Sequence, residues 1–211
     1  MHALAKLYVG SVAANLVMLA LTIRAYAEPF SLVMDPFSWL GKIETAGGHS
    51  NTIAFLLFSG TMLVDAYIWH RALTILPGTG SSGRLTMGWL LGRGVLVGFI
   101  LMAFPCDRFV LIHNIGAGLV VGGFWALTTG MLYRCREKLG AVVHLGLQLI
   151  LHCTALYCGA NFVWDTPLKG FSQRPLLLAM MADTGLCLRR TAFSAHSPRS
   201  EGCEFEHYSC G

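Results

Sequence analysis

The feature that most constrains this chain is a series of apolar stretches, each about as long as a membrane is thick. A helix needs ~20 mostly apolar residues to cross the hydrocarbon core of a bilayer. We predict five spanning helices, at Ala3 to Ala27, Asn51 to Trp69, Leu85 to Phe104, Phe109 to Tyr133 and Leu139 to Trp164. The predicted fold class is therefore all-α, a polytopic transmembrane helix bundle.

A sixth span has a weaker pattern. Pro175 to Leu188 is apolar but short, and Asp183 interrupts it. Two interpretations stay open, a short or re-entrant span and a segment at the membrane surface, and we favour the span. We assign residues 1–190 to the bundle and 191–211 to a disordered polar tail rich in Ser, Glu, His and Arg. An unusual splice or a reading-frame change is another origin for such a tail.

The composition supports a membrane protein and excludes some partners. Apolar residues make up 55% of the 211 residues and charged residues 12%, against about 25% charged in soluble domains. A soluble chain this short could not hide so much apolar surface in one core. The net charge of +4 is divided among short clusters, and no basic patch is interleaved with aromatic residues. We expect the lipid bilayer as a partner and no nucleic acid.

The charges between the stretches predict an orientation. With the N-terminus in the cytoplasm, most basic residues lie inside: Lys6, Arg71, Arg84, Arg134, Arg136, Lys138, and with a sixth span Arg189 and Arg190. Cytoplasmic loops carry the excess of Lys and Arg, so we favour this orientation. Ala25 to Ala27 also resembles the cleavage site of a signal peptide, although Asn15 and Arg24 argue against cleavage.

Small residues four apart predict where helices approach closely. The pairs are Gly88 with Gly92, Gly94 with Gly98, and Gly118 with Gly122, which Gly123 follows. Lipid tails provide no hydrophobic drive for helix pairing, so close backbone contact stabilises a bundle instead. Glycine is also simply common in membrane helices. Because the pairs lie in neighbouring spans, we predict a glycine seam there.

Two ionisable residues lie at membrane depth, Asp65 in the second span and Arg93 in the third. The two spans run in opposite directions, and both residues are about 9 to 12 Å from the predicted inner surface at 1.5 Å per residue. We therefore predict an intramembrane ion pair. It is either a structural salt bridge, which we favour, or part of a proton or ion path.

The predicted topology gathers polar residues at the outer face. Four of them, Asp107, His113, His49 and Asp165, are candidate catalytic residues, accompanied by Glu44, Asn51, Cys106 and Asn161. A histidine beside a carboxylate can act as a tuned base. The structural alternatives are that Asp107 caps a helix and that the other residues are polar because they lie in loops. The set could also bind a cation, but its spacing is not diagnostic, so we assign no metal site and leave the cofactor unknown.

Several motifs resemble a known family. Asp35-Pro36-Phe37-Ser38-Trp39-Leu40-Gly41 is similar to its loop ending in Leu-Gly, Asn51 opens the next span, and Phe104-Pro105-Cys106-Asp107 precedes an early His113. The family comprises small, usually six-span membrane proteins catalogued as domain-of-unknown-function family 998. The resemblance covers about Leu4 to Trp164 and implies a six-span bundle without an established activity.

Three functions remain open. The first is a membrane protein of unknown molecular activity that acts through partners or lipids. The second is a small intramembrane enzyme acting on a hydrophobic small molecule, a lipid or isoprenoid-like substrate, with its acid and base at the outer face. The third is a proton- or ion-coupled carrier that uses Asp65 and Arg93. Phosphate-loop, zinc-protease and nucleophile-elbow motifs are absent from the sequence.

Overall fold

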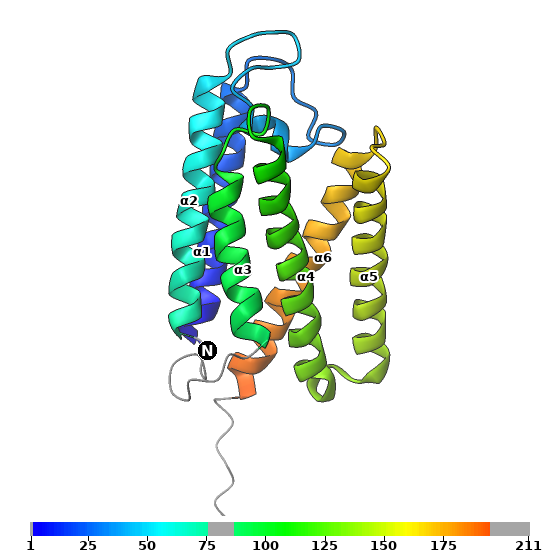
Figure 1. Cartoon of the computed structure of the whole chain (residues 1–211). Coiled ribbons are helices and arrows are strands. Elements are labelled where there is room, and N and C mark those ends of the chain that lie inside the picture. Colours follow the sequence, from blue (N-terminus) through cyan, green and yellow to red (C-terminus); the bar gives the residue numbers. More distant parts are fainter. Residues whose placement is uncertain (1, 76–86, 195–211) are drawn as a thin grey trace, which may run out of the picture.

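A computed structural model describes residues 2–75 and 87–194 of the chain. These residues form α-helices and one short 3-10 helix, η1, without a β-strand, which confirms the predicted helix bundle (Figure 1). The elements are α1 (His2–Ala25), η1 (Phe37–Gly41), α2 (Thr52–Ile75), α3 (Met87–Met102), α4 (Val110–Leu139), α5 (Ala141–Val163) and α6 (Lys169–Ser194).

Four of the five predicted spans are helices long and apolar enough to cross a membrane: α1, α2, α4 and α5. The third, α3, is shorter than predicted, with 16 residues and a length of about 24 Å. It ends at Met102 because Pro105 follows and cannot continue a helix. Helix α4 is longer than predicted and runs through the charged segment to Leu139, because a helix can continue beyond the apolar part of its sequence.

The predicted short sixth span needs correction. It is part of α6, a helix of 26 residues that begins before Pro175 and ends after Leu188. Its sequence is not apolar enough to count among the candidate spans, yet α6 packs against α1, α4 and α5. The predicted start of the tail, residue 191, lies inside α6, and residues 195–211 lie outside the described part of the chain.

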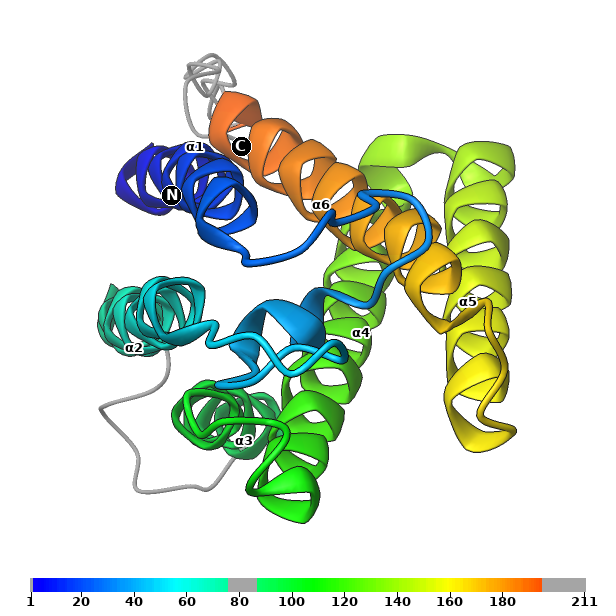
Figure 2. The same ribbon diagram turned by 90° about the horizontal axis from the view of Figure 1, so that it is seen from above.

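The helices form a ring with one helix outside it. Neighbours along the ring are α1, α2, α3, α4 and α6, and α6 returns to α1, while α5 packs on α4 and α6 (Figure 2). The ring is closed by its first and last helices. At one end α4 passes into α5 through Gly140 alone, whose φ of +79° favours glycine.

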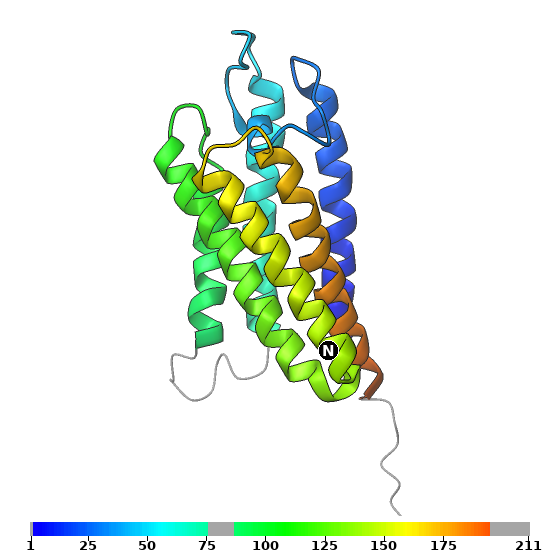
Figure 3. The same ribbon diagram turned by 90° about the vertical axis from the view of Figure 1, so that its right-hand side faces the viewer.

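The two ends of the bundle differ. One end, the N-terminal end, carries the start of α1, the start of α3 and the last residues of α6 (Figure 1). The other end is covered by two loops, residues 26–51 and 103–109, which we call the cap (Figures 1 and 3). The predicted inner basic residues that the structure describes lie toward the N-terminal end, whereas Arg84 lies outside the described residues.

The predicted glycine seam joins α3 and α4, with a partly different set of residues. A methyl group on Gly98 would lie 2.8 Å from the carbonyl oxygen of Gly116, and one on Gly116 would lie 2.8 Å from that of Gly98. A methyl group on Gly123 would lie closer still to the side chain of Val95. By contrast, a methyl group added to Gly88, Gly118 or Gly122 would have no neighbour within 4 Å. Of the predicted glycines, Gly98 and Gly123 therefore lie at the contact between α3 and α4, together with Gly116, which was not predicted.

Large apolar side chains cover the outside of the bundle. Examples on α4 and α5 are Leu111, Leu145 and Leu156, which are 73%, 69% and 75% exposed. Contiguous apolar surface of this extent is rare on soluble monomers. Together with four helices of membrane-spanning length, this surface identifies an integral membrane protein in contact with lipid.

Candidate functional site

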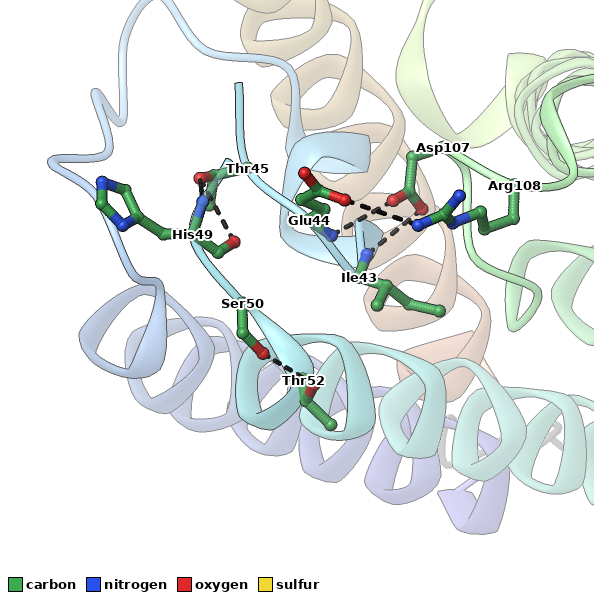
Figure 4. Close-up of polar contacts among 8 residues, drawn as sticks. All are labelled: Ile43, Glu44, Thr45, His49, Ser50, Thr52, Asp107 and Arg108. Atoms are coloured by element: carbon green, nitrogen blue, oxygen red, sulfur yellow. Dashed lines mark hydrogen bonds and ion pairs between the residues drawn. The ribbon is translucent and has the colours of Figure 1, made fainter. Parts of the chain in front are cut away.

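Asp107 joins the two loops of the cap. It lies between α3 and α4, and its two carboxylate oxygens accept hydrogen bonds from the backbone N–H groups of Ile43 and Glu44, each at 3.1 Å (Figure 4). Arg108 reaches back to Glu44 at 3.4 Å in an exposed ion pair. Both oxygens of Asp107 are therefore engaged in holding the loop that leads into α2.

Cys106 and Asn51 strengthen the same junction. The backbone N–H of Cys106 donates to the carbonyl of Gly41 at 3.1 Å, and its thiol donates to that of Ser38 at 3.0 Å. Burial raises the pKa of the Cys106 thiol to about 11, so the group stays a donor. Asn51, 1% exposed, donates to the carbonyl of Lys42 at 2.9 Å and accepts from the N–H of Ala27 at 3.3 Å.

His49 does not approach Asp107. Its backbone N–H donates to the hydroxyl of Thr45 at 3.1 Å, and its exposed ring points away from Asp107 (Figure 4). The acidic neighbour of this turn is Glu28, which accepts hydrogen bonds from the Thr45 hydroxyl and from the N–H of Gly47. The hydrogen bond from Thr45 lowers the pKa of Glu28 below its usual value.

His113 is buried, and it does not pair with Asp107. It lies one turn into α4, is 1% exposed, and its ring stacks on Phe58 with centroids 6.2 Å apart. Its Nδ1 lies 3.2 Å from the carbonyl oxygen of Phe104. Its Nε2 is buried without a hydrogen bond among the described residues. The ring thus fixes the turn before α4 and is closed to a substrate.

Asp165 belongs to a separate turn. It has a φ of +52° between α5 and α6, and it forms an ion pair with Lys169 one turn later. Its side chain is 84% exposed. The four candidate catalytic residues therefore do not converge on one point.

Helix α6 holds the cap through two residues that sequence reasoning did not single out. Arg174 donates to the carbonyls of Leu32, at 2.8 Å, and Asp35, at 2.6 Å, and its guanidinium lies 4.0 Å from the ring centroid of Phe37. The side-chain oxygen of Gln173 accepts from the N–H of Phe37 at 3.2 Å. No local sequence pattern marks contacts between positions so far apart in the chain.

The structure does not join Asp65 and Arg93. The buried carboxylate of Asp65 accepts a hydrogen bond from the side-chain amide of Asn15 in α1 at 2.7 Å. The guanidinium of Arg93 lies 5.2 Å from the ring centroid of Trp89. Long basic side chains near the end of a spanning helix extend toward the membrane surface, and Trp89 lies on that side of Arg93. Across the described residues, no ion pair includes either side chain.

Asp183 in α6 is a further buried carboxylate. It is 2% exposed, and its Oδ2 has no hydrogen-bond partner in the described part of the chain. Its place inside an apolar stretch is the signal that could have identified it. Within residues 2–75 and 87–194, no three metal-ligating side chains come together.

The polar residues thus fall into two groups with different chemistry. Those of the cap donate and accept hydrogen bonds that fix loops, which leaves no acid–base pair facing a shared space. Those at membrane depth are carboxylates in spanning or neighbouring helices without a cationic partner among the described residues. The second group is the candidate functional site. No family model, curated protein or solved structure matches this chain.

Proposed function

We propose that the protein is a small proton- or ion-coupled carrier and that Asp65 is its ion-binding group. The observation that carries the proposal is a carboxylate at membrane depth whose partner is a neutral amide. Asp65 lies thirteen residues after Thr52, about 20 Å from the cap end of α2. It is 8% exposed.

The contacts of Asn15 support an ionisable role for Asp65. The side-chain nitrogen of Asn15 donates both to the carbonyl of Ser11 at 3.0 Å and to Oδ1 of Asp65 at 2.7 Å. Two acceptors fix the orientation of the amide, which presents hydrogens to the carboxylate. Carboxylates inside a membrane are costly without a proton or a cation, and they mark proton and ion pathways.

Two further statements belong to the proposal. We place the chain in the six-span family that its cap motifs resemble; the hydrogen bonds of Asn51, Asp107 and His113 support this by giving the motif residues a shared architectural role. We also place the N-terminus in the cytoplasm, because the described basic residues are concentrated toward that end and such an excess is typical of cytoplasmic surfaces.

The first experiment measures ion binding and needs no knowledge of the cargo. The thermal midpoint of the purified protein is recorded over a pH series and over lithium, sodium and potassium chloride at constant ionic strength. An ion that binds only the folded state stabilises it, by about 2.7 kcal/mol at a hundred times its Kd. We expect Asp65→Asn to abolish the ion-dependent shift, or to reduce the pH-dependent shift by the contribution of one carboxyl group, and the matched exposed variant Asp165→Asn to retain both.

The second experiment tests carriage. Cells that produce the wild-type protein, Asp65→Asn or Asp165→Asn at equal levels are compared by metabolite profiles of cell and medium. We expect a redistributed compound in the wild-type and Asp165→Asn cells that is absent with Asp65→Asn. If Asp65→Asn folds and matches the wild-type protein in both experiments, the carrier function is wrong. Should Asp65→Asn not accumulate, Asn15→Ala, which removes the hydrogen bond to the carboxylate, is expected to alter the ion- or pH-dependent shift, and Asp65→Glu, which keeps the carboxylate, is expected to retain it.

A further inference from the structure

Asp183 lies in α6, at a depth comparable to that of Asp65 in α2. It follows Lys169 by fourteen residues, which is about 21 Å along the helix. The two carboxylates therefore occupy two helices that both pack against α1. The proposed carrier function uses only Asp65, and Asp183 has no role in it.

The surroundings of Asp183 are polar but without a charge. Its neighbour Thr184 lies with its hydroxyl 3.3 Å from that of Thr128 in α4. Two residues before Asp183, the carbonyl of Met181 accepts a hydrogen bond from the hydroxyl of Tyr8 in α1. One turn after it, the thiol of Cys187 interacts with that of Cys135 in α4.

The titratable groups of the elements packed against α6 leave Asp183 without a cation. Around it lie Tyr8 from α1, hydrogen-bonded to Met181, and Cys187 of α6 with Cys135 of α4. Helix α5 contributes Cys158, which lies beside Ser172 much nearer the cap, and His152, whose Nδ1 accepts from the indole of Trp125 at 3.0 Å. His144 lies in the first turn of α5, at the end of the bundle opposite the cap. Both ion pairs among the described residues lie elsewhere.

A buried carboxyl oxygen without a hydrogen-bond partner, such as Oδ2 of Asp183 among the described residues, calls for a physical explanation. Buried polar atoms almost always have a partner, and an exception points to a functional group, a water or an ion. Burying an isolated carboxylate costs far more than burying its neutral form. The described residues bring no three metal-ligating side chains together around it. Its surroundings therefore suit a proton, which needs only one oxygen atom to bind it.

We propose that Asp183 is a proton-binding site in α6, in which Oδ2 takes up a proton and the carboxylate loses its charge. The site gives the bundle a second ionisable position on the far side of α1 from Asp65. It depends on different atoms from the proposed carrier site, so either site can be tested without the other.

Infrared spectroscopy of the full-length protein in lipid vesicles tests the site directly. A protonated carboxyl group has a carbonyl stretching band distinct from that of a carboxylate, and the band shifts when H2O is replaced by D2O. We expect Asp183→Asn to remove one carboxyl equivalent of this band near neutral pH. Asp165→Asn, which changes an exposed carboxylate, is expected to leave the band intact.

Each outcome has one meaning for the site. An unchanged band in a folded Asp183→Asn variant would overturn the proton site. So would a carboxyl band that Asp183→Asn lacks and that disappears from the wild-type protein on addition of sodium or potassium chloride at constant pH, since Asp183 would then bind a metal cation. If Asp183→Asn does not fold, Asp183→Glu is expected to retain the band at a shifted position, and an unshifted band would contradict the site. The carboxyl band of the Asp65→Asn variant is compared with that of the wild-type protein separately, and it bears on the carrier proposal alone.

Discussion

Asp107 illustrates how a carboxylate in a loop can act on the fold through its acceptor atoms alone. It accepts hydrogen bonds from Ile43 and Glu44, which lie 64 and 63 positions earlier in the chain, and so connects the two loops of the cap. We expect Asp107→Ala to destabilise the protein by about 1–3 kcal/mol, because two backbone donors lose their partner. The thermal midpoint and the rate of tryptic cleavage after Lys42 in the cap measure the effect.

The matched control for this change is Asp165→Asn, which removes an exposed carboxylate charge from the other turn at the same end and keeps a residue type that tolerates the φ of +52°. It is expected to change stability by less than ~1 kcal/mol, since exposed ion pairs contribute little. Equal midpoints and equal cleavage rates for the two variants would show that Asp107 does not hold the cap.

The buried thiol of Cys106 leads to a prediction about how its alkylation rate depends on pH. Its pKa of about 11 is a consequence of burial, and only the thiolate reacts with alkylating reagents. We expect iodoacetamide to modify Cys106 roughly three hundredfold more slowly at neutral pH than an exposed thiol, whose pKa is ~8.5, with a rate that rises through the alkaline range. Mass spectrometry of the peptide measures the rate, with the denatured protein as the reference. A rate that is already constant at neutral pH would contradict the predicted burial.

At the scale of single residues, the sequence drew attention to polar positions in and beside the cap, and their hydrogen-bond partners in the structure are backbone groups. Asp107, His113 and Asn51 stand out because polar residues at the ends of apolar stretches are conspicuous. Their partners are backbone groups brought near by tertiary structure, which no spacing encodes. The contacts of Arg174 depend in the same way on the position of α6 relative to the cap.

Helices α3 and α4 provide the prediction at the scale of elements. Gly116 faces the carbonyl oxygen of Gly98 at a distance that leaves no room for a methyl group, whereas Gly118, two residues on, faces open space. We expect Gly116→Ala to lower stability by about 1–3 kcal/mol through overpacking. Gly118→Ala is expected to leave it unchanged or raised by up to about 1 kcal/mol, since alanine favours helix.

Thermal unfolding in one detergent compares the two variants directly. The chemical change and the helix are the same, so the difference between the midpoints isolates the contact with α3. A loss of stability in Gly118→Ala equal to that in Gly116→Ala would mean that the seam lies elsewhere on α4.

The helices themselves were largely predictable, because length and apolarity determine what can cross a bilayer. The positions of α1, α2, α4 and α5 follow from these two properties. Helix α6 was predicted too short because it mixes apolar residues with Gln173, Arg174 and Asp183. Several of its polar groups face the cap or the interior rather than lipid, and apolarity alone does not detect a helix of this kind.

At the scale of the whole molecule, the proposed orientation in the membrane can be tested by labelling cysteines from one side. Ala46 is exposed in the cap and Glu137 is exposed near the opposite end of the bundle. With the proposed orientation, a membrane-impermeant maleimide labels Ala46→Cys in intact cells, above the signal of the chain's own cysteines. Glu137→Cys is expected to react only after permeabilisation. The reverse pattern would place the N-terminus outside the cytoplasm.

The closed ring of helices has a consequence for synthesis. Helix α1 leaves the ribosome before α6, so the contact between these two helices has to wait until α6 is made. Asn15 can meet Asp65 as soon as α2 is inserted, whereas the hydroxyl of Tyr8 waits for almost the whole chain. Chains are made at ~5–20 residues per second, so the Tyr8 hydroxyl waits roughly 10–35 s for the carbonyl of Met181, which lies 173 positions later in the chain. During that interval the nascent bundle is an open arc, and α6 closes it.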